Sequence, residues 1–262
     1  MKDRSSVDRV LTILQYLARH PGEHGVRALS AALELSPSTV DRLLKSLLQA
    51  GFVRQNEATS RYAIGVQAVQ LGLAALSTFD LTAIAPSYLQ ALVAETGESA
   101  FLAVLDEGEV VYLLKQEGQY AIRTTAILGS RRPAHCTALG KSFLATMPLL
   151  EAKSLLQRKG MAAMTAHTIT DLNRLWEELA QVRLRGYAID HEEVEEGLMC
   201  LGAPIRNHQG QTIAAISLAG PVARVLPCEE QYGRRVAATA QEISLALGYV
   251  PRLATDPSLA PG

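Results

Sequence analysis

Cysteine is scarce in this sequence, and no long apolar run interrupts it. The 262 residues hold three cysteines, Cys136, Cys200 and Cys228, an odd number without metal-finger spacing, so we expect reduced thiols and no disulfide scaffold. No stretch approaches the roughly 20 apolar residues that a membrane-spanning helix needs. The first residues lead into an amphipathic pattern and not into the apolar block of a signal peptide. We therefore expect a cytoplasmic protein without membrane contact.

The chain also lacks a strong net charge, because two opposite balances cancel. The formal charge is -1, and 48% of the residues are hydrophobic, which is typical of a soluble globular protein. Residues 1–65 hold nine Lys/Arg against six Asp/Glu, whereas the remaining residues hold sixteen against twenty. A basic N-terminal part before an acidic body is compatible with nucleic-acid contact at one end. The length suggests two domains.

Three short helices are predicted at the N-terminus. Apolar residues at helical spacing predict a helix over 6–19 that ends before Pro21 and Gly22, and a second short helix carries Val26 and Leu29. For the third helix, Ser36 is the expected N-cap, with Pro37 at the first helical position. This helix runs to Ala50, where Gly51 provides its C-terminal cap.

The predicted third helix has two chemically different faces. We expect the apolar face to be buried; it comprises Val40, Leu43, Leu44, Leu47 and Leu48. The opposite face carries Ser38, Thr39, Arg42 and Lys45, followed by Ser46 and Gln49. Hydroxyls and cations can bind phosphates and base edges. Taken alone, such a face is more often an ordinary solvated helix surface.

The segments after the third helix favour the DNA-binding alternative. Residues 52–54 and 61–64 flank a polar loop and are predicted to form a β-hairpin. Three helices followed by a hairpin make a winged helix-turn-helix, in which the third helix enters the major groove of DNA and the wing approaches the backbone. Arg54 and Arg61 are then candidates for phosphate contacts.

The rest of the chain is predicted to form a second, larger domain. We assign residues 1–65 to the DNA-binding domain, 66–79 to a linker helix that could pair with its copy in a second subunit, and 80–250 to a mixed domain. A tail over 251–262, rich in proline and alanine, is expected to be disordered. Strands are predicted at 100–105, 110–114, 121–125, 187–190, 201–206 and 212–219. Helices are predicted at 81–96, 138–146, 149–159, 171–185 and 229–247. Helices around a largely antiparallel sheet give an α+β class.

One segment that could carry chemistry surrounds a predicted helix start. Gly140-Lys141-Ser142 superficially matches the end of a phosphate-binding loop, but the glycine required five residues earlier is His135. Thr137 can instead cap a helix that begins at Ala138, and free N–H groups in its first turn could bind an anion. A capped helix without any ligand remains the alternative.

A second segment is rich in carboxylates between two predicted strands. Asp190 follows an apolar strand and is the first of five carboxylates in seven positions, and Cys200 begins the next strand. These carboxylates could simply coat the surface, but strand ends often line pockets. A cysteine with His135 or His191 and Asp190 could form a catalytic set, and the same residues could bind zinc. Neither alternative has a recognisable signature, so we assign no catalytic residue, cofactor or metal.

Taken together, these segments resemble the IclR family of bacterial transcription regulators. The resemblance extends in consistent order over residues 5–250. Its matching stretches are 10–14, 36–44, 62–65, 135–141, 183–193, 202–205 and 214–221. A single one of these stretches would be weak evidence, whereas the ordered series is specific.

The resemblance implies a ligand-responsive transcription regulator. It implies a winged helix-turn-helix domain, a GAF-like effector-binding domain, and assembly as homodimers or homotetramers on a double-stranded DNA operator. Family ligands are often small organic acids, so the resemblance implies that this regulator senses a small organic acid and controls catabolic genes. The implied effector-binding positions are Ala138, Leu139, Asp190, Cys200 and Ser217. Some relatives have a second serine where this chain has Ala219, so one possible hydrogen-bond donor is missing.

Overall fold

The computed structural model describes residues 5–77, 81–122, 124 and 126–250, with the side chains of 75–77 left undescribed. The chain forms two compact units, Met1–Phe79 and Asp80–Gly262. Each unit has its own hydrophobic core. The predicted tail over 251–262 lies outside the described residues.

The N-terminal unit begins with the three expected helices, which are α1 (Ser6–Arg19), α2 (Val26–Leu33) and α3 (Pro37–Gln49). The predicted start of α3 is confirmed, because the Ser36 side chain accepts a hydrogen bond from the N–H of Thr39 and Pro37 occupies the first turn. Gly51 follows α3 with φ of 74°, a left-handed conformation that glycine adopts without a steric penalty. The chain can therefore leave α3 in a tight turn.

The expected hairpin follows, with strands β1 (Val53–Gln55) and β2 (Tyr62–Ile64) paired antiparallel. A β-bridge between His24 and Tyr62 fastens this hairpin to the loop before α2. The next helix is α4 (Val66–Ser77). The predicted apolar face of α3 was wrong at Leu48, which is 37% exposed. Leu47 already fills the last core position of the helix, and Leu48 lies one residue, about 100°, further round.

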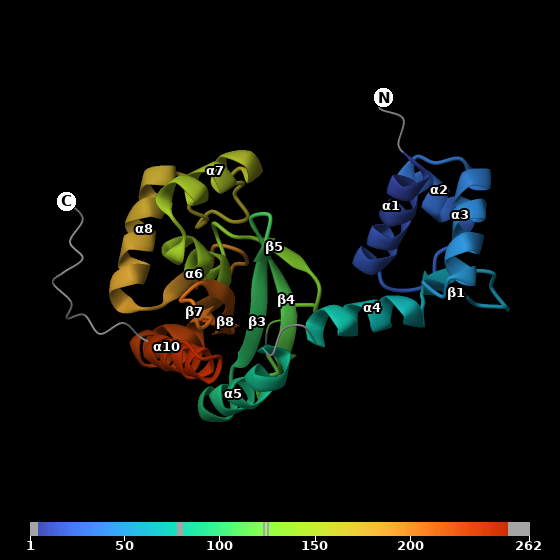
Figure 1. Ribbon diagram of the computed structural model, residues 1–262. Helices are drawn as coiled ribbons and strands as arrows, with labels where there is room; N and C mark the ends of the chain where they lie inside the picture. The colour runs from blue at the N-terminus through green and yellow to red at the C-terminus, as the bar shows by residue number, and fades with distance from the viewer. Residues whose placement is uncertain (1–4, 78–80, 123, 125, 251–262) are drawn as a thin grey trace. The chain divides into compact units, whose positions relative to one another are not determined.

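The C-terminal unit is built on one antiparallel sheet of six strands in the order β5-β4-β3-β8-β7-β6 (Figure 1). The strands are β3 (Ser99–Asp106), β4 (Glu109–Gln116), β5 (Arg131–Pro133), β6 (Ala188–His191), β7 (Leu198–Arg206) and β8 (Thr212–Pro221). The helices are α5 (Leu81–Thr96), α6 (Ala138–Thr146), α7 (Leu149–Lys159), α8 (Leu172–Arg185), α9 (Val222–Val225) and α10 (Glu229–Ala246), with a 3-10 turn over Leu226–Cys228.

The two faces of this sheet differ in side-chain size. Successive side chains in a strand point to opposite faces, and large residues such as Leu102, Leu201 and Ile216 face the core formed with α5 and α10. The other face carries small residues, including Ala103, Ala215, Gly202 and Ser217, and α6 packs on it. Figure 1 shows α6 with α7 and α8 on one side of the sheet and α5 with α10 on the other. Small side chains allow the α6 backbone to approach the sheet closely.

The predicted strand at 121–125 was wrong. Residues 121 and 122 form a bend, while 123 and 125 lie outside the described residues. Within this segment the carbonyl of Ile122 accepts a hydrogen bond from Arg224 at 2.8 Å, and just before it the N–H of Gln119 donates to the carbonyl of Gly97. The place beside β4 is taken by β5, which the sequence analysis missed. None of the described helices is long and apolar enough to span a membrane.

Candidate functional site

The exposed face of α3 is the first candidate site. Ser38, Arg42 and Lys45 are exposed, and Thr39 is half-buried. The opposite face is fixed by the buried Val40, Leu43, Leu44 and Leu47. The polar side of the helix therefore stays outward from the core of its own unit.

Three of these side chains have local partners that were not predicted from the sequence. The ammonium of Lys45 lies 2.8 Å from the Asp41 carboxylate, which raises the Lys45 pKa through a hydrogen bond and charge attraction. The Ser36 hydroxyl at the N-cap contacts the hydroxyls of Ser38 and Thr39 at 3.1 and 2.8 Å. In the described part of the chain Arg42 forms no ion pair, so its guanidinium is open to a partner.

The wing is held by a carboxylate from the loop between α1 and α2. Both Glu23 oxygens accept hydrogen bonds from the Asn56 amide, at 3.0 and 3.1 Å, and one accepts from the Thr59 hydroxyl at 3.2 Å. These bonds lower the Glu23 pKa. Arg54 lies 3.9 Å from Glu23, whereas Arg61 is exposed. Of the two predicted wing arginines, Arg54 is thus partly neutralised.

The second candidate site lies on the small-residue face of the large sheet. Strand pairing sets Asp190 opposite Cys200, and Ser217 opposite Gly202. A Cβ on Gly202 would lie 2.7 Å from the backbone of Ala138, so the first residue of α6 touches β7. Four of the five predicted effector positions therefore lie on adjoining strands or against them.

The fifth position, Leu139, lies nearby in an apolar cluster with Ala103, Val110, Phe143 and Ala215. Aromatic residues extend this wall, because Phe101 is paired with Ser217 and meets Tyr112 edge to face at 5.5 Å. Ser217 is buried, with an exposed fraction of 3%. Within the described residues its hydroxyl has no hydrogen-bond partner.

The helix start at Thr137 has the expected geometry. The Thr137 hydroxyl accepts a hydrogen bond from the N–H of Gly140 at 3.0 Å, and the N–H of Lys141 donates to the Thr137 carbonyl. These bonds use the third and fourth N–H groups of α6. The N–H groups of Ala138 and Leu139 are left to meet a ligand, as is usual for a first helical turn.

Burial dominates the electrostatics of this site. It raises the pKa of Asp190 to about 7, with Glu193 adding to the shift and Lys141 opposing it. Burial also raises the pKa of the Cys136 thiol to about 12. For Cys200, burial and the neighbouring Asp190 carboxylate raise the thiol pKa well above its ordinary value. The site therefore holds a carboxyl that titrates near neutral pH between neutral thiols.

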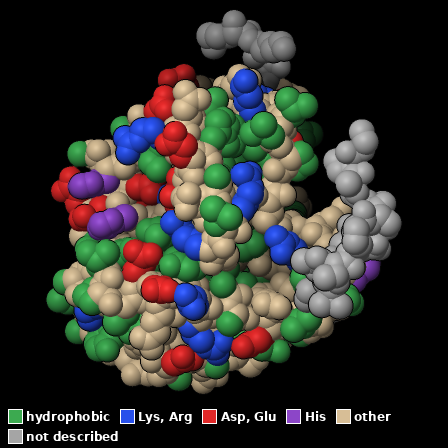
Figure 2. Space-filling view, turned by 90° about the vertical axis from the view of Figure 1, so that its left-hand side faces the viewer, with side chains coloured by type: hydrophobic (Ala, Val, Ile, Leu, Met, Phe, Trp, Pro, Cys, Tyr) green, Lys and Arg blue, Asp and Glu red, His purple; other side chains and the backbone are tan. Residues whose placement is uncertain are grey.

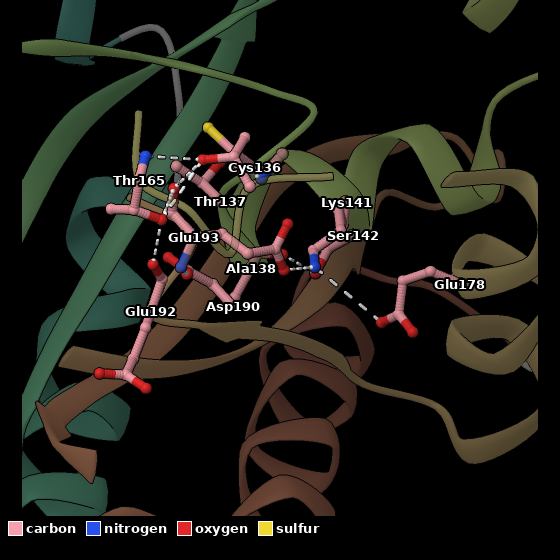
Figure 3. Close-up of polar contacts among 12 residues, drawn as sticks. Cys136, Thr137, Ala138, Lys141, Ser142, Thr165, Glu178, Asp190, Glu192 and Glu193 are labelled. Carbon is pink, nitrogen blue, oxygen red and sulfur yellow. Dashed lines mark hydrogen bonds and ion pairs between the residues drawn. The ribbon is translucent and has the colours of Figure 1, made fainter. Parts of the chain in front are cut away.

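The buried ion pair next to Asp190 was not predicted from the sequence. Lys141 is 1% exposed and forms an ion pair with Glu193, which is 5% exposed. Figure 3 shows the Lys141 ammonium between the carboxylates of Glu193 and Glu178. The second distance is 4.0 Å. The Gly-Lys-Ser sequence drew attention to Lys141 as a possible phosphate ligand, but only the fold shows that it is paired with carboxylates.

The geometry does not assemble the catalytic set considered from the sequence. The His135 ring contacts the carbonyl of Ala162 at 3.1 Å, and His191 is exposed beside Glu192. A nucleophilic cysteine needs a lowered pKa, whereas the pKa values of Cys136 and Cys200 are both raised. Throughout the described ranges, no group of three His, Cys, Asp or Glu side chains is placed to hold a metal.

A separate groove of about 1410 Å³ lies at the other end of α6. It is bordered by the last turns of α6 and α8, by the turn between β7 and β8, and by α10, and its lining includes Arg183, Arg206 and Gln241. None of the five predicted effector positions lines it. Figure 2 shows acidic and basic side chains interspersed over the face that carries α8 and α10. Because none of the predicted effector positions lines the groove, we place the candidate site at the start of α6, where the buried polar groups converge.

Comparison with known families identifies both domains of the chain. Residues 6–57 match the IclR helix-turn-helix domain, and residues 73–245 match the family described as bacterial transcriptional regulator IclR C-terminal. The chain belongs to the IclR family. Its fold is accordingly an N-terminal winged helix-turn-helix joined to a C-terminal, GAF-like effector-binding domain.

Individual relatives cover nearly the whole chain. The transcriptional repressor IclR of Escherichia coli K12 is 36% identical over 246 residues, which are 93% of this chain and 90% of that protein. The crystal structure of Thermotoga maritima IclR is 33% identical, covers 93% of this chain and 99% of its own, and has a TM-score of 0.77. An IclR homolog from Microbacterium hydrocarbonoxydans, complexed with 4-hydroxybenzoate, shares the fold at 22% identity with a TM-score of 0.81 over 92% of this chain and 100% of its own.

Membership in the family gives the general function of the chain. It is a DNA-binding transcription regulator of the IclR type whose C-terminal domain binds an effector.

Proposed function

We propose that this regulator senses a small carboxylic acid between the start of α6 and the sheet. The observation that carries the proposal is the convergence of unpaired donors: the N–H groups of Ala138 and Leu139 and the buried, unpartnered Ser217 hydroxyl. A carboxylate accepts several hydrogen bonds and suits a helix N-terminus. Asp190 and Cys200 complete the site on one side, and the apolar wall near Leu139 suits the carbon skeleton of the acid.

We further propose that α3 reads an operator. In this proposal Arg42, Ser38 and Thr39 contact base edges or phosphates, and Lys45, Arg54 and Arg61 assist on the phosphate backbone. Two copies joined through α4 in a homodimer or homotetramer would bind a palindromic, double-stranded operator in the cytoplasm. The effector would act by preferring one arrangement of the two DNA-binding domains, so that its binding and DNA binding are coupled. The proposal involves no catalytic step, cofactor or metal.

A mobility-shift assay tests the role of Arg42. The probe is the DNA upstream of the gene for this protein and of its neighbouring genes. Arg42→Ala should lower affinity about tenfold or more, since a specific arginine contact is worth about 1–3 kcal/mol, and should reduce the salt dependence. Arg174→Ala removes an exposed arginine from α8 and serves as the matched control. Equal affinities for the two variants would refute the assignment.

Calorimetry tests the effector proposal. Purified full-length protein is titrated with pyruvate, glyoxylate, benzoate and 4-hydroxybenzoate, and with the corresponding amides as neutral controls. We expect an acid to bind while its amide does not, and Asp190→Ala should abolish the response without changing operator affinity in the absence of ligand. Preference for amides, or the absence of binding by a wider panel of acids, would refute the carboxylate assignment.

A further inference from the structure

The connection between β6 and β7 folds back so that two carboxyl groups become neighbours. Asp190 is 3% exposed, near the end of β6. Three residues later, the N–H of Glu193 donates to Asp190 Oδ1 at 2.8 Å. Glu192 between them adopts φ of 61°, and its carboxylate accepts a hydrogen bond from the N–H of Gly197 at 2.7 Å. The tight turn therefore fixes the Glu193 side chain relative to Asp190.

The loop between α7 and α8 secures the same turn from outside. The Thr165 hydroxyl donates to the carbonyl of Glu192, and the Thr168 hydroxyl donates to that of Glu193, each at 2.6 Å. Figure 3 shows Thr165 above the Glu192 and Glu193 backbone. Because the carbonyls of Glu192 and Glu193 are both hydrogen-bonded, the backbone of the turn is fixed, and so is the direction in which each carboxylate leaves it.

A single buried lysine serves these carboxyl groups. Lys141 on α6 is paired with Glu193, and its next carboxylate is Glu178 at 4.0 Å. Glu178 is itself paired with Arg185 at 2.5 Å. Three carboxyl groups, those of Asp190, Glu193 and Glu178, thus share two cations. The carboxyl without a direct cation is Asp190, and its burial makes it costly to ionise.

The surroundings of Asp190 further disfavour its ionised form. Burial raises its pKa to about 7, and Glu193 raises it further while Lys141 opposes the shift. Neutral thiols and a phenol lie around it and supply no positive charge. The titratable and charged groups that face Asp190 are Lys141 from α6, Glu193 from the turn, Cys200 from β7, Tyr112 from β4 and Cys136 from the segment before α6.

We propose that Glu193 is a specificity-determining residue of the effector site: by engaging Lys141 it leaves the buried Asp190 carboxyl without a direct cation, so that Asp190 meets an acid anion as a protonated hydrogen-bond donor. This inference rests on the acid-binding function proposed above. An ionised Asp190 would repel a carboxylate, whereas a protonated one offers a donor beside the α6 N–H groups. Where Asp190 is ionised, it must take up one proton from the solution before or as the anion binds, so acid binding strengthens as the pH falls through 7.

Carbon-13 NMR of the side-chain carboxyls tests the inference without any ligand. Full-length protein labelled at the aspartate carboxyl carbon is titrated, and Asp190→Asn identifies the Asp190 signal by its loss. We expect a midpoint of about 7 in the parent protein. In Glu193→Gln, Lys141 becomes available to Asp190 and one negative charge disappears, so the midpoint should fall by about one pH unit or more.

Two further variants make the result specific. Glu196→Gln removes an exposed carboxylate from the same connection and should leave the midpoint in place. Glu178→Gln, at a partly exposed position, should lower the midpoint in the same direction by a smaller amount, and it provides the test if Glu193→Gln fails to fold. An unchanged or raised midpoint in the folded variants would overturn the inference. Failure of every acid to bind in calorimetry would instead overturn the proposed function and leave these midpoints as they are.

Discussion

At the scale of single residues, Ser217 separates ligand binding from stability. Its buried hydroxyl has no partner in the described structure, so Ser217→Ala removes no hydrogen bond within the protein. We expect a nearly unchanged free energy of unfolding. Affinity for the acid effector should fall about two- to tenfold, because one hydrogen bond contributes about 0.5–1.5 kcal/mol. Urea unfolding and calorimetry measure the two effects.

Ser99 is the control for this prediction. It lies on the same face of the sheet, opposite Ala219, but its hydroxyl accepts a hydrogen bond from the N–H of Gly118 at 3.0 Å. Ser99→Ala leaves that donor without its partner and should cost about 1–3 kcal/mol of stability. If Ser217→Ala destabilises the protein as much as Ser99→Ala does, the Ser217 hydroxyl has a structural role.

Asp190 should make the stability of the C-terminal unit depend on pH. Its pKa is about 7 when folded, against an ordinary value of 3.8. Between these values the folded chain keeps a proton that the unfolded chain releases, so the free energy of unfolding falls as the pH rises from 4 to 7. Asp190→Asn cannot titrate. The variant should therefore gain stability over the parent protein toward pH 8, by at most about 4 kcal/mol.

Thermal unfolding at several pH values measures this difference. The other titrating groups are common to both proteins and largely cancel in the comparison. A gap between parent and variant that stays constant from pH 5 to 8 would contradict the raised pKa of Asp190.

Much of the site chemistry was predictable from the sequence at this scale, but the ion pair was not. Asp190 and Thr137 were identified because each stands at the end of a predicted element, where local rules apply. Lys141 and Glu193 are 52 positions apart, and only the packing of α6 against the β6–β7 connection brings them together. A lysine in an apolar helix and a glutamate among other glutamates carry no local sign that they are buried.

At the scale of elements, the wing depends on a residue outside it. Glu23 accepts hydrogen bonds from Asn56 and Thr59 and thereby fixes the loop between β1 and β2. Glu23→Ala removes a negative charge from a DNA-binding domain, which by charge alone would strengthen binding. We expect the opposite, a several-fold loss of operator affinity, because the released wing must be ordered again when DNA binds.

Glu57→Ala is the matched control. Glu57 lies exposed on the loop between β1 and β2. Its replacement by alanine removes one negative charge, as Glu23→Ala does, but leaves the Glu23 contacts in place. Operator affinity should therefore stay unchanged or rise. Tighter operator binding by Glu23→Ala in the mobility-shift assay would show that its charge matters more than its hydrogen bonds.

Most elements were predicted from local patterns, and the errors have physical reasons. Helices α1, α5, α6 and α7 have the expected bounds, because capping residues and apolar periodicity act within a few positions. The segment 121–125 resembled a strand, but a strand also needs a neighbouring edge, and β5 pairs with β4 instead. Tertiary competition of this kind leaves no mark in a short window of sequence.

At the scale of the whole molecule, α4 offers an apolar surface for assembly. Its exposed residues Val66, Val69, Leu71 and Leu73 are each more than half accessible. If α4 pairs with a second copy, Leu73→Glu places a charge in that contact and should shift the protein toward monomers. Operator binding should weaken in parallel, because two heads bind a palindrome together.

Sedimentation measures the oligomeric state, and Gln70→Glu on the same helix adds the same charge at an already polar, exposed position. The control should keep the parent assembly. An unchanged assembly in Leu73→Glu would mean that subunits meet elsewhere.

The contact of α6 with its surroundings has a mechanical consequence. A Cβ on Gly140 would lie 2.2 Å from the Ala134 backbone, and one on Gly202 would lie 2.7 Å from Ala138, so main chain rests directly on main chain at this end of the helix. Close-packed backbone has no soft side chain to absorb a push. A ligand bound beneath Ala138 would tilt the nine-residue helix α6. The C-terminal end of the helix, about 12 Å away, would move furthest.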